Sequence, residues 1–380
     1  MSAQGGQAHA KAADQGALVQ DSKFADKSSQ NEQAEEPQNP KNRKRRIPEG
    51  IIFAPIPISS PAIGSGVVLA GGYIFPFRKA DRVSPPSTVA GAAVITDNGT
   101  RGLVLAGEFY LKENSYHITT AYFHGNINYN FYGVGADAGN SSAKLPLEQT
   151  GQAFLGEFLY RLKGKLFLGP RILSGSSTIT LRSETEGKVQ PPPDAGIETQ
   201  LTGIGFRLNR DSRLNRFYPT QGTFLDFTSI YFSEDLGSKY SFQSHRFGFN
   251  GYQGLTGKQV LAYNIYACVS GGKPPFYGEC IYGANNELRG YVGGQHIDKY
   301  MIATQGEYRL ALPWRLGMVA FAGLGEVAPT IGQFSYDNLL PAFGGGLRLK
   351  LSKKYGVNLR ADIAQGRDGH TFSMGIGEAF

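Results

Sequence analysis

The sequence has no long apolar run, few charged residues and only two cysteines. No stretch approaches the roughly 18 consecutive apolar residues that a membrane-spanning helix requires. Charged residues make up 18% of the 380-residue chain, fewer than in an average soluble protein. The six histidines are scattered, and no pair has the spacing of metal ligands. A transmembrane helix and a metal site are therefore not indicated.

The motifs of common catalytic sites are also absent. The chain contains no GxSxG elbow, no P-loop and no HExxH motif. Its net charge is +7, but the densest basic run, residues 41–46, lies in a polar segment without interleaved aromatic residues. We therefore expect no enzyme, no cofactor and no nucleic-acid partner.

The chain is rich in glycine and aromatic residues, with 51 Gly, 20 Tyr and 24 Phe. This composition favours β-structure with many turns. Residues 1–50 differ, because they are poor in bulky apolar residues and lack the apolar core of a secretory signal. We expect a disordered, polar and basic N-terminal tail over 1–50 and one β-domain over 51–380.

Period-2 alternation is clearest near the C-terminus. In 300–312 one parity carries Tyr300, Ile302, Tyr308, Leu310 and Leu312, and the other carries Gln305, Glu307 and Arg309. The ranges 347–351, 357–363 and 372–380 alternate in the same way. The pattern fits a soluble sandwich with charges outside, and it equally fits a membrane barrel with charges in the lumen. Alternation alone leaves both open.

Connection lengths favour the membrane barrel. The long connections 129–149, 178–197, 271–298 and 328–341 alternate with short turns, as in barrels with short periplasmic turns and long surface loops. An even number of strands places the N-terminal tail and the C-terminus on the periplasmic side. We predict sixteen strands, at 51–58, 64–75, 87–96, 101–112, 116–128, 150–162, 165–177, 198–209, 220–233, 240–254, 258–270, 299–312, 315–327, 342–352, 356–365 and 370–380. The first is the weakest, because Pro55 and Pro57 cannot donate to a ladder.

Five stretches resemble the BamA/TamA family of bacterial outer-membrane barrels, also known as the surface-antigen family. "PIPISSPAIGSG" at 55–66 is similar to the start of the family's barrel, and "DSRLNRFYPTQGT" at 211–223 to its one long periplasmic turn. "LRGY" at 288–291 matches the family's hook, "GEYRLALP" at 306–313 the next strand, and "GIGEAF" at 375–380 the terminal strand. The resemblance implies a transmembrane antiparallel β-barrel with a surface loop folded inward after strand 11.

The resemblance also implies a role for the hook, Leu288, Arg289, Gly290 and Tyr291. In the family, the hook arginine enters the lumen and pairs with acids on the inner wall. Glu307 lies on the polar parity of the following strand, so we expect it to be the partner of Arg289, whose planar fork suits a carboxylate. The alternative is that Arg289 is a solvated loop residue.

This sequence departs from the family pattern in two ways. The family's second acid corresponds to Gly323 here, so we expect Arg289 to keep one carboxylate, with Glu326 close enough in sequence to compensate. Family members that assemble proteins also carry POTRA modules before the barrel, and others carry a patatin-like hydrolase. Only residues 1–50 precede the barrel in this sequence, so the resemblance does not carry over a full assembly activity.

The final strand and the cysteines offer further candidates. Phe372, Met374, Ile376 and Phe380 share a parity and resemble the signal by which the assembly machinery recognises its substrates; alternatively, they simply face lipid. Cys268 and Cys280 flank the first arm of the hook loop. They either form a disulfide in an oxidising envelope or remain two unpaired thiols.

We therefore expect an outer-membrane barrel of the BamA/TamA type, involved in assembly or insertion of outer-membrane proteins or lipids. Its partners would be outer-membrane lipid and, during biogenesis, the assembly machinery, whereas its client or solute is unknown. Two alternatives keep the barrel, as a loop-plugged transport pore or as a structural anchor. A third is a soluble β-protein with a basic tail.

Overall fold

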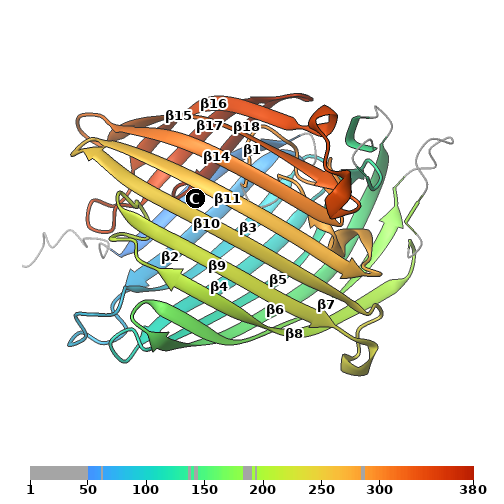
Figure 1. Ribbon diagram of the computed structural model, residues 1–380, viewed down its shortest axis with the longest axis horizontal. Coiled ribbons are helices and arrows are strands. Elements are labelled where there is room, and N and C mark those ends of the chain that lie inside the picture. The colour runs from blue at the N-terminus through green and yellow to red at the C-terminus, as the bar shows by residue number, and fades with distance from the viewer. Residues whose placement is uncertain are drawn as a thin grey trace, which may run out of the picture. The chain divides into compact units, whose positions relative to one another are not determined.

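Sixteen strands form one antiparallel sheet that curls into a nearly closed barrel (Figure 1). The computed structural model describes residues 50–60, 63–135, 138–140, 144–182, 191–192, 195–283 and 287–380. Except for Gly50, the expected N-terminal tail lies outside the described residues. Among the described residues, no helix is long and apolar enough to cross a membrane.

Consecutive strands pair with each other around the sheet, and two further short strands pair in a loop. The barrel strands are β1 (Ile51–Ser60), β2 (Gly64–Phe75), β3 (Ser87–Thr96), β4 (Arg101–Leu111), β5 (Tyr116–Phe131), β6 (Leu145–Lys163), β7 (Leu166–Leu181), β8 (Glu198–Asp211), β9 (Gly222–Phe232), β10 (Phe242–Thr256), β11 (Gln259–Gly272), β14 (Tyr300–Ala311), β15 (Leu316–Ala328), β16 (Leu340–Lys350), β17 (Asn358–Gly366) and β18 (Gly369–Ile376). The loop strands are β12 (Cys280–Ile281) and β13 (Ile297–Asp298). The described single-turn 3₁₀ helices are η2 (Ala138–Asn140), η3 (Glu234–Leu236), η4 (Phe276–Gly278), η5 (Ile331–Gln333) and η6 (Tyr336–Asn338).

The sixteen barrel strands predicted from the sequence are confirmed, including the doubtful first one, which pairs with β2 along its whole length. Four predicted strand ends were wrong by three or more residues: β5 ends at Phe131, β6 begins at Leu145, β7 ends at Leu181 and β18 ends at Ile376. The ladder between β5 and β6 continues to the pair Phe131 and Leu145, so β6 begins earlier than predicted. The last strand ends at Ile376 instead of residue 380, because Gly377 adopts a φ of +92° and turns the chain away.

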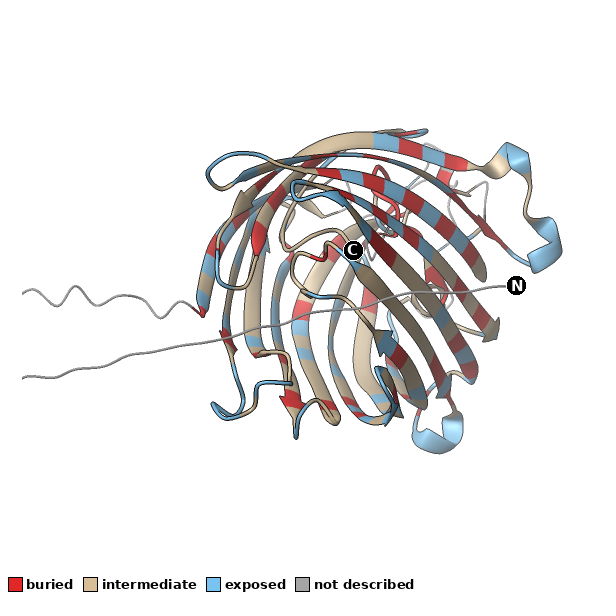
Figure 2. Cartoon of the chain, turned by 60° about the vertical axis from the view of Figure 1, so that its left-hand side comes forward, coloured by how far each residue is buried: buried red, intermediate tan, exposed pale blue. Residues whose placement is uncertain are grey.

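Apolar side chains face outward and charged ones face the lumen. Along β14, Gln305, Glu307 and Arg309 are each 1% exposed, whereas Ile302 and Tyr308 are exposed. Figure 2 shows the same alternation as bands of buried and exposed residues along the strands. In water this arrangement would expose a large apolar surface, whereas in a bilayer the outer surface meets acyl chains.

The two ends of the barrel differ in their connections. We call one the short-turn end; its seven connections are 76–86, 112–115, 164–165, 212–221, 257–258, 312–315 and 351–357. The opposite, long-loop end includes 182–197, 233–241 and 273–299, the last of which contains η4, β12, β13 and the hook. The predicted segregation holds in part, because 76–86 and 212–221 are long connections at the short-turn end, and 97–100 and 367–368 are short ones at the long-loop end.

The strands β1 and β18 form the two edges of the sheet and come within 8 Å of each other (Figure 1). Within the described residues, no hydrogen-bonded ladder joins them. We call this boundary the seam.

Candidate functional site: the hook in the lumen

The hook lies inside the barrel, with Leu288, Arg289 and Tyr291 all buried. Gly290 has a φ of +109°, a conformation that side chains rarely adopt. A Cβ placed on it would lie 3.0 Å from the Cβ of Ala342 in β16. The glycine therefore serves two needs, the backbone turn and close contact with the barrel wall.

All three nitrogens of the Arg289 guanidinium group donate hydrogen bonds. Its Nε donates to Gln305 Oε1 at 3.0 Å. Its two terminal nitrogens donate to carboxylates, Nη1 to Asp362 Oδ2 at 2.9 Å and Nη2 to Glu307 Oε2 at 2.5 Å. Its Cζ also lies 3.5 Å from the ring centroid of Phe321, a cation–π contact. The hook arginine therefore bridges β14 and β17, and the structure does not leave it as a solvated loop residue.

The expectation of a single carboxylate partner was wrong, because Asp362 of β17 supplies a second. Gly323 occupies the position where the resemblance predicted a second acid, and a Cβ there would lie 2.6 Å from Leu288 Cδ1. The hook leucine therefore fills the space beside Gly323. Glu326 does not compensate, since its Oε1 accepts from the backbone N of Ser335 at 2.8 Å.

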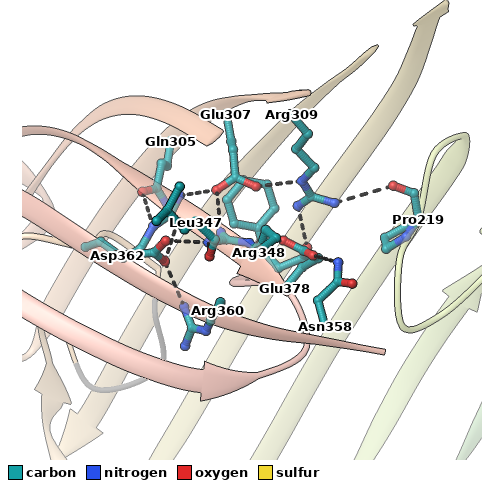
Figure 3. Close-up of polar contacts among 12 residues, drawn as sticks. Pro219, Gln305, Glu307, Arg309, Leu347, Arg348, Asn358, Arg360, Asp362 and Glu378 are labelled. Atoms are coloured by element: carbon teal, nitrogen blue, oxygen red, sulfur yellow. Dashed lines mark hydrogen bonds and ion pairs between the residues drawn. The ribbon is translucent and has the colours of Figure 1, made fainter. Parts of the chain in front are cut away.

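The ion pairs extend beyond the hook into a larger network (Figure 3). Glu307 also accepts from Arg309 Nε at 2.6 Å, and Asp362 from Arg348 Nη1 at 2.5 Å. Arg348 Nε continues to Glu378 Oε2 at 2.7 Å. Glu307, Asp362 and Glu378 thus each have at least two arginine or amide donors, as charge burial requires.

The segment 212–221 enters the lumen from the short-turn end. Arg309 Nη1 donates to Pro219 O at 3.4 Å, and Arg216 pairs with Glu108 of β4 at 2.9 Å. The segment thus lies between β4 and β14. Because Arg309 also binds Glu307, one chain of contacts connects the hook to this segment. The lumen is obstructed from both ends.

The C-terminal residues turn into this network. Phe380 O accepts from Arg309 Nη2 at 3.0 Å, and Glu378 also accepts from Asn358 Nδ2 at 2.6 Å. The expectation that Phe380 continues the outward parity of the last strand was therefore wrong. Phe372 is exposed on β18, and Met374 and Ile376 are half-buried.

The base of the hook loop is fixed by covalent and polar contacts. The structure joins Cys268 of β11 to Cys280 of β12 by a disulfide. Tyr291 Oη donates to Pro341 O at 2.6 Å and accepts from Arg367 N at 3.1 Å. His296 Nε2 lies 2.7 Å from Asp368 Oδ2.

Two titratable groups in this loop are perturbed by burial. Burial lowers the pKa of His296, while the hydrogen bond and charge of Asp368 oppose this change. Burial and the nearby charge of Asp298 raise the pKa of Glu279 to about 7, against the opposing charge of Lys299.

Sequence reasoning found Arg289 and Glu307 and missed two acids, Asp362 and Glu378. The inward parity of Asp362 was visible, but its approach to the hook required the register of four strands. Two glycines of β16 make room for it: a Cβ on Gly346 would overlap Asp362, and one on Gly344 would lie 2.7 Å from Phe321. The run of three glycines at 344–346 was the available signal.

The barrel fold is matched by known proteins. The family model described as the Omp85 superfamily domain matches residues 111–380, more than half of the chain. The chain belongs to the Omp85 superfamily. It is thus an integral outer-membrane barrel of the type involved in protein assembly or transport, and members of this superfamily are assembly and transport barrels that work with lipids and assembly machinery.

Solved structures show the same fold as this Omp85 barrel. BamA from Haemophilus ducreyi lacking POTRA domains 1–3 has a TM-score of 0.54 and 13% identity, covering 86% of this chain and 70% of that chain. CdiB from Acinetobacter baumannii has a TM-score of 0.55 and 13% identity, covering 86% and 59%. CdiB from Escherichia coli has a TM-score of 0.55 and 11% identity, covering 86% and 61%. No curated protein sequence matches the chain, and no group of three or more metal-ligating side chains occurs among its described residues.

Proposed function

We propose that this barrel assembles outer-membrane β-proteins by pairing client strands with its own edge at the seam. A strand edge with unpaired backbone groups is a template for strand addition. Under this proposal both termini of the barrel lie on the periplasmic side with the short turns, where an unfolded client would arrive.

The main support for this proposal is the hydrogen-bonding pattern of β1. Ile74 N donates to Gly50 O at 2.9 Å, and Ile51 is the partner of Tyr73. Because bonding alternates along an antiparallel pair, even-numbered residues of β1 bond to β2 and odd-numbered residues face the seam. Pro55 and Pro57 are odd-numbered and have no N–H, so two adjacent seam-facing positions offer no donor to β18.

The other edge is short. β18 has 8 residues against 10 in β1. Gly377 N still donates to Asn358 O of β17 at 2.7 Å, and beyond Gly377 the chain leaves the sheet, with Glu378 held by Arg348. The proline positions weaken one edge and the inward turn removes part of the other, so the seam is the weakest boundary of the barrel.

The hook lies directly behind the seam. A hollow of about 230 Å³ is lined by hook residues including Leu288 and Tyr291 together with Ile58 of β1 and Phe372 and Met374 of β18. Movement of the hook would therefore change the support of both edges. We infer that the Arg289 network holds the seam in the arrangement described, and that release of Arg289 accompanies client entry.

The test restores the missing donors. Pro55→Val combined with Pro57→Val supplies two seam-facing N–H groups, so pairing between β1 and β18 should strengthen. Vesicles containing the full chain should accelerate insertion of an unfolded outer-membrane β-barrel, and the double variant should lose most of that acceleration. Folding of each variant is checked by heat-modifiable gel migration.

The matched control is Pro170→Val in β7, a strand paired on both sides. It should leave insertion unchanged. An unaltered rate in the double variant would remove the proline argument, and vesicles that perform no better than empty ones would remove the proposed function.

A gated transport pore is the second candidate. It is favoured by a cavity of about 850 Å³ at the short-turn end, lined by Arg82, Glu108, Arg213 and Arg216 among others. Here the hook and the segment 212–221 would act as two gates. Conductance in a planar bilayer that responds to a transported solute would favour this function over strand addition.

Two further expectations from the sequence remain proposals. Phe372, Met374, Ile376 and Phe380 are proposed to direct the barrel's own insertion by the assembly machinery, which would recognise them before Phe380 takes its inward position in the folded barrel. The Cys268–Cys280 disulfide is proposed to form in the envelope and to fix the first arm of the hook loop.

A further inference from the structure

Charge is distributed unequally between the two ends of the barrel. The seven connections of the short-turn end contain eleven lysines and arginines against two acids, Asp81 and Glu113. Every one of the seven carries at least one basic residue. The connections of the long-loop end contain eight basic residues against twelve acids. The difference is therefore a property of a whole rim, not of one loop.

The basic residues lie where the apolar outer surface ends. Trp314 is 77% exposed and precedes Arg315, and Phe77 is 51% exposed and precedes Arg78. Exposed aromatic residues at strand ends mark the level of the lipid headgroups. Arg213 and Arg216 are excluded from this rim, because both turn inward and pair with Asp211.

We propose that the short-turn rim binds the headgroups of anionic glycerophospholipids in the leaflet that it faces. Basic side chains at a membrane surface attract anionic lipids, and basic residues spread over the six connections other than 212–221 fit a partner that surrounds the barrel. An acidic protein would dock on one side and would require a local patch. If the short turns lie on the periplasmic side, as proposed above, this leaflet is the periplasmic one; the proposal does not otherwise depend on the orientation.

The sole tryptophan of the chain, Trp314, supplies the probe. Two short turns flank its own, since Ala311 N donates to Lys258 O and Lys350 N to Arg315 O, each at 2.8 Å. The full chain is placed in vesicles of phosphatidylcholine with a minor fraction of phosphatidylglycerol, and one of the two lipids is brominated near the top of an acyl chain. At equal mole fraction, brominated phosphatidylglycerol should quench Trp314 more strongly than brominated phosphatidylcholine does. One basic side chain that binds the headgroup should enrich phosphatidylglycerol beside Trp314 about fivefold. High salt should reduce the enrichment.

The variant Lys258→Gln with Lys353→Gln removes two exposed charges beside Trp314 and should bring the enrichment close to one. The control Lys239→Gln with Lys273→Gln removes two exposed charges at the long-loop end and should leave it unchanged. Equal quenching by the two brominated lipids in the unmodified chain would overturn the proposal, as would an enrichment that survives the Lys258 and Lys353 changes. Neither result touches strand addition, because quenching by either lipid still places Trp314 at the bilayer.

Discussion

Replacing Arg289 with alanine should free the hook. Breaking a buried ion pair costs about 3–5 kcal/mol because a charge is left without its partner. Here both carboxylates keep another arginine, Glu307 through Arg309 and Asp362 through Arg348. We therefore expect the lower end of that range, about 3 kcal/mol, which shifts the hook's docking equilibrium about 100-fold.

The assay is thiol labelling at Ala303→Cys. Ala303 is 4% exposed and packs in the same cluster as Leu288 and Tyr291, so a docked hook protects it. If labelling proceeds through transient release of the hook, its rate should rise about 100-fold on Arg289→Ala, and single-barrel conductance should rise from a low value. Arg289→Lys should give an intermediate rate, because lysine keeps the charge but cannot form three directed hydrogen bonds.

The control is Arg101→Ala, an exposed arginine of β4, which should change neither readout. Labelling and conductance that stay unchanged in Arg289→Ala would refute the arginine-held hook. A double-mutant cycle with Asp362→Asn then separates the direct ion pair from indirect loss of packing.

Three further changes test neighbouring parts of the account. Gly323→Ala should strain both hook docking and the pairing of β14 with β15, because its Cβ would lie 2.6 Å from Leu288 Cδ1 and would overlap Thr304 O, and the Ala303→Cys labelling rate should rise; an unchanged rate would contradict this close packing. The raised pKa of Glu279, about 7 against an ordinary 4.5, makes the loop most stable below about pH 4.5 and progressively less stable as pH rises through 7; proteolysis of the loop should accelerate over that window, and Glu279→Gln should flatten the dependence. Cysteines at Leu347 and Ile363, both exposed, should react with bilayer-dissolved probes, whereas one at Lys350 should not; the reverse would mean that the inner and outer faces are exchanged.

The strands were predictable because the two faces of a barrel wall meet different solvents. Along β14 that difference alternates the burial of successive residues, and the same alternation is written in the sequence. The end of β18 was not predictable in this way, since Phe380 keeps the parity of Phe372 but follows Gly377. A single residue with positive φ changed the direction of the chain, and parity does not detect such a change.

The hook was predictable in position but not in its full set of partners. Glu307 lies in the strand that follows the loop, so local order was sufficient. Asp362 reaches Arg289 only because β14, β15, β16 and β17 pair in one register and glycines in β16 leave space. Such a contact depends on how four strands pair in succession and on the space that glycines leave free. Neither can be recognised from the sequence of a single strand.

The seam was hidden in the sequence for a different reason. Pro55 and Pro57 were recognised as poor donors, which made the first strand doubtful. In the structure the pairing with β2 is intact, because the backbone nitrogens of both prolines face the seam and not β2. The prolines therefore weaken the edge instead of the strand.

Amide hydrogen exchange along β1 would show whether the seam-facing amides are unpaired. The amide of Ala54 bonds toward β2, whereas that of Phe53 faces the seam. We predict strong protection at Ala54 and fast exchange at Phe53, with the contrast lost in the Pro55→Val and Pro57→Val variant as the seam closes. Equal and strong protection at both amides in the unmodified chain would show a closed seam and would contradict the account.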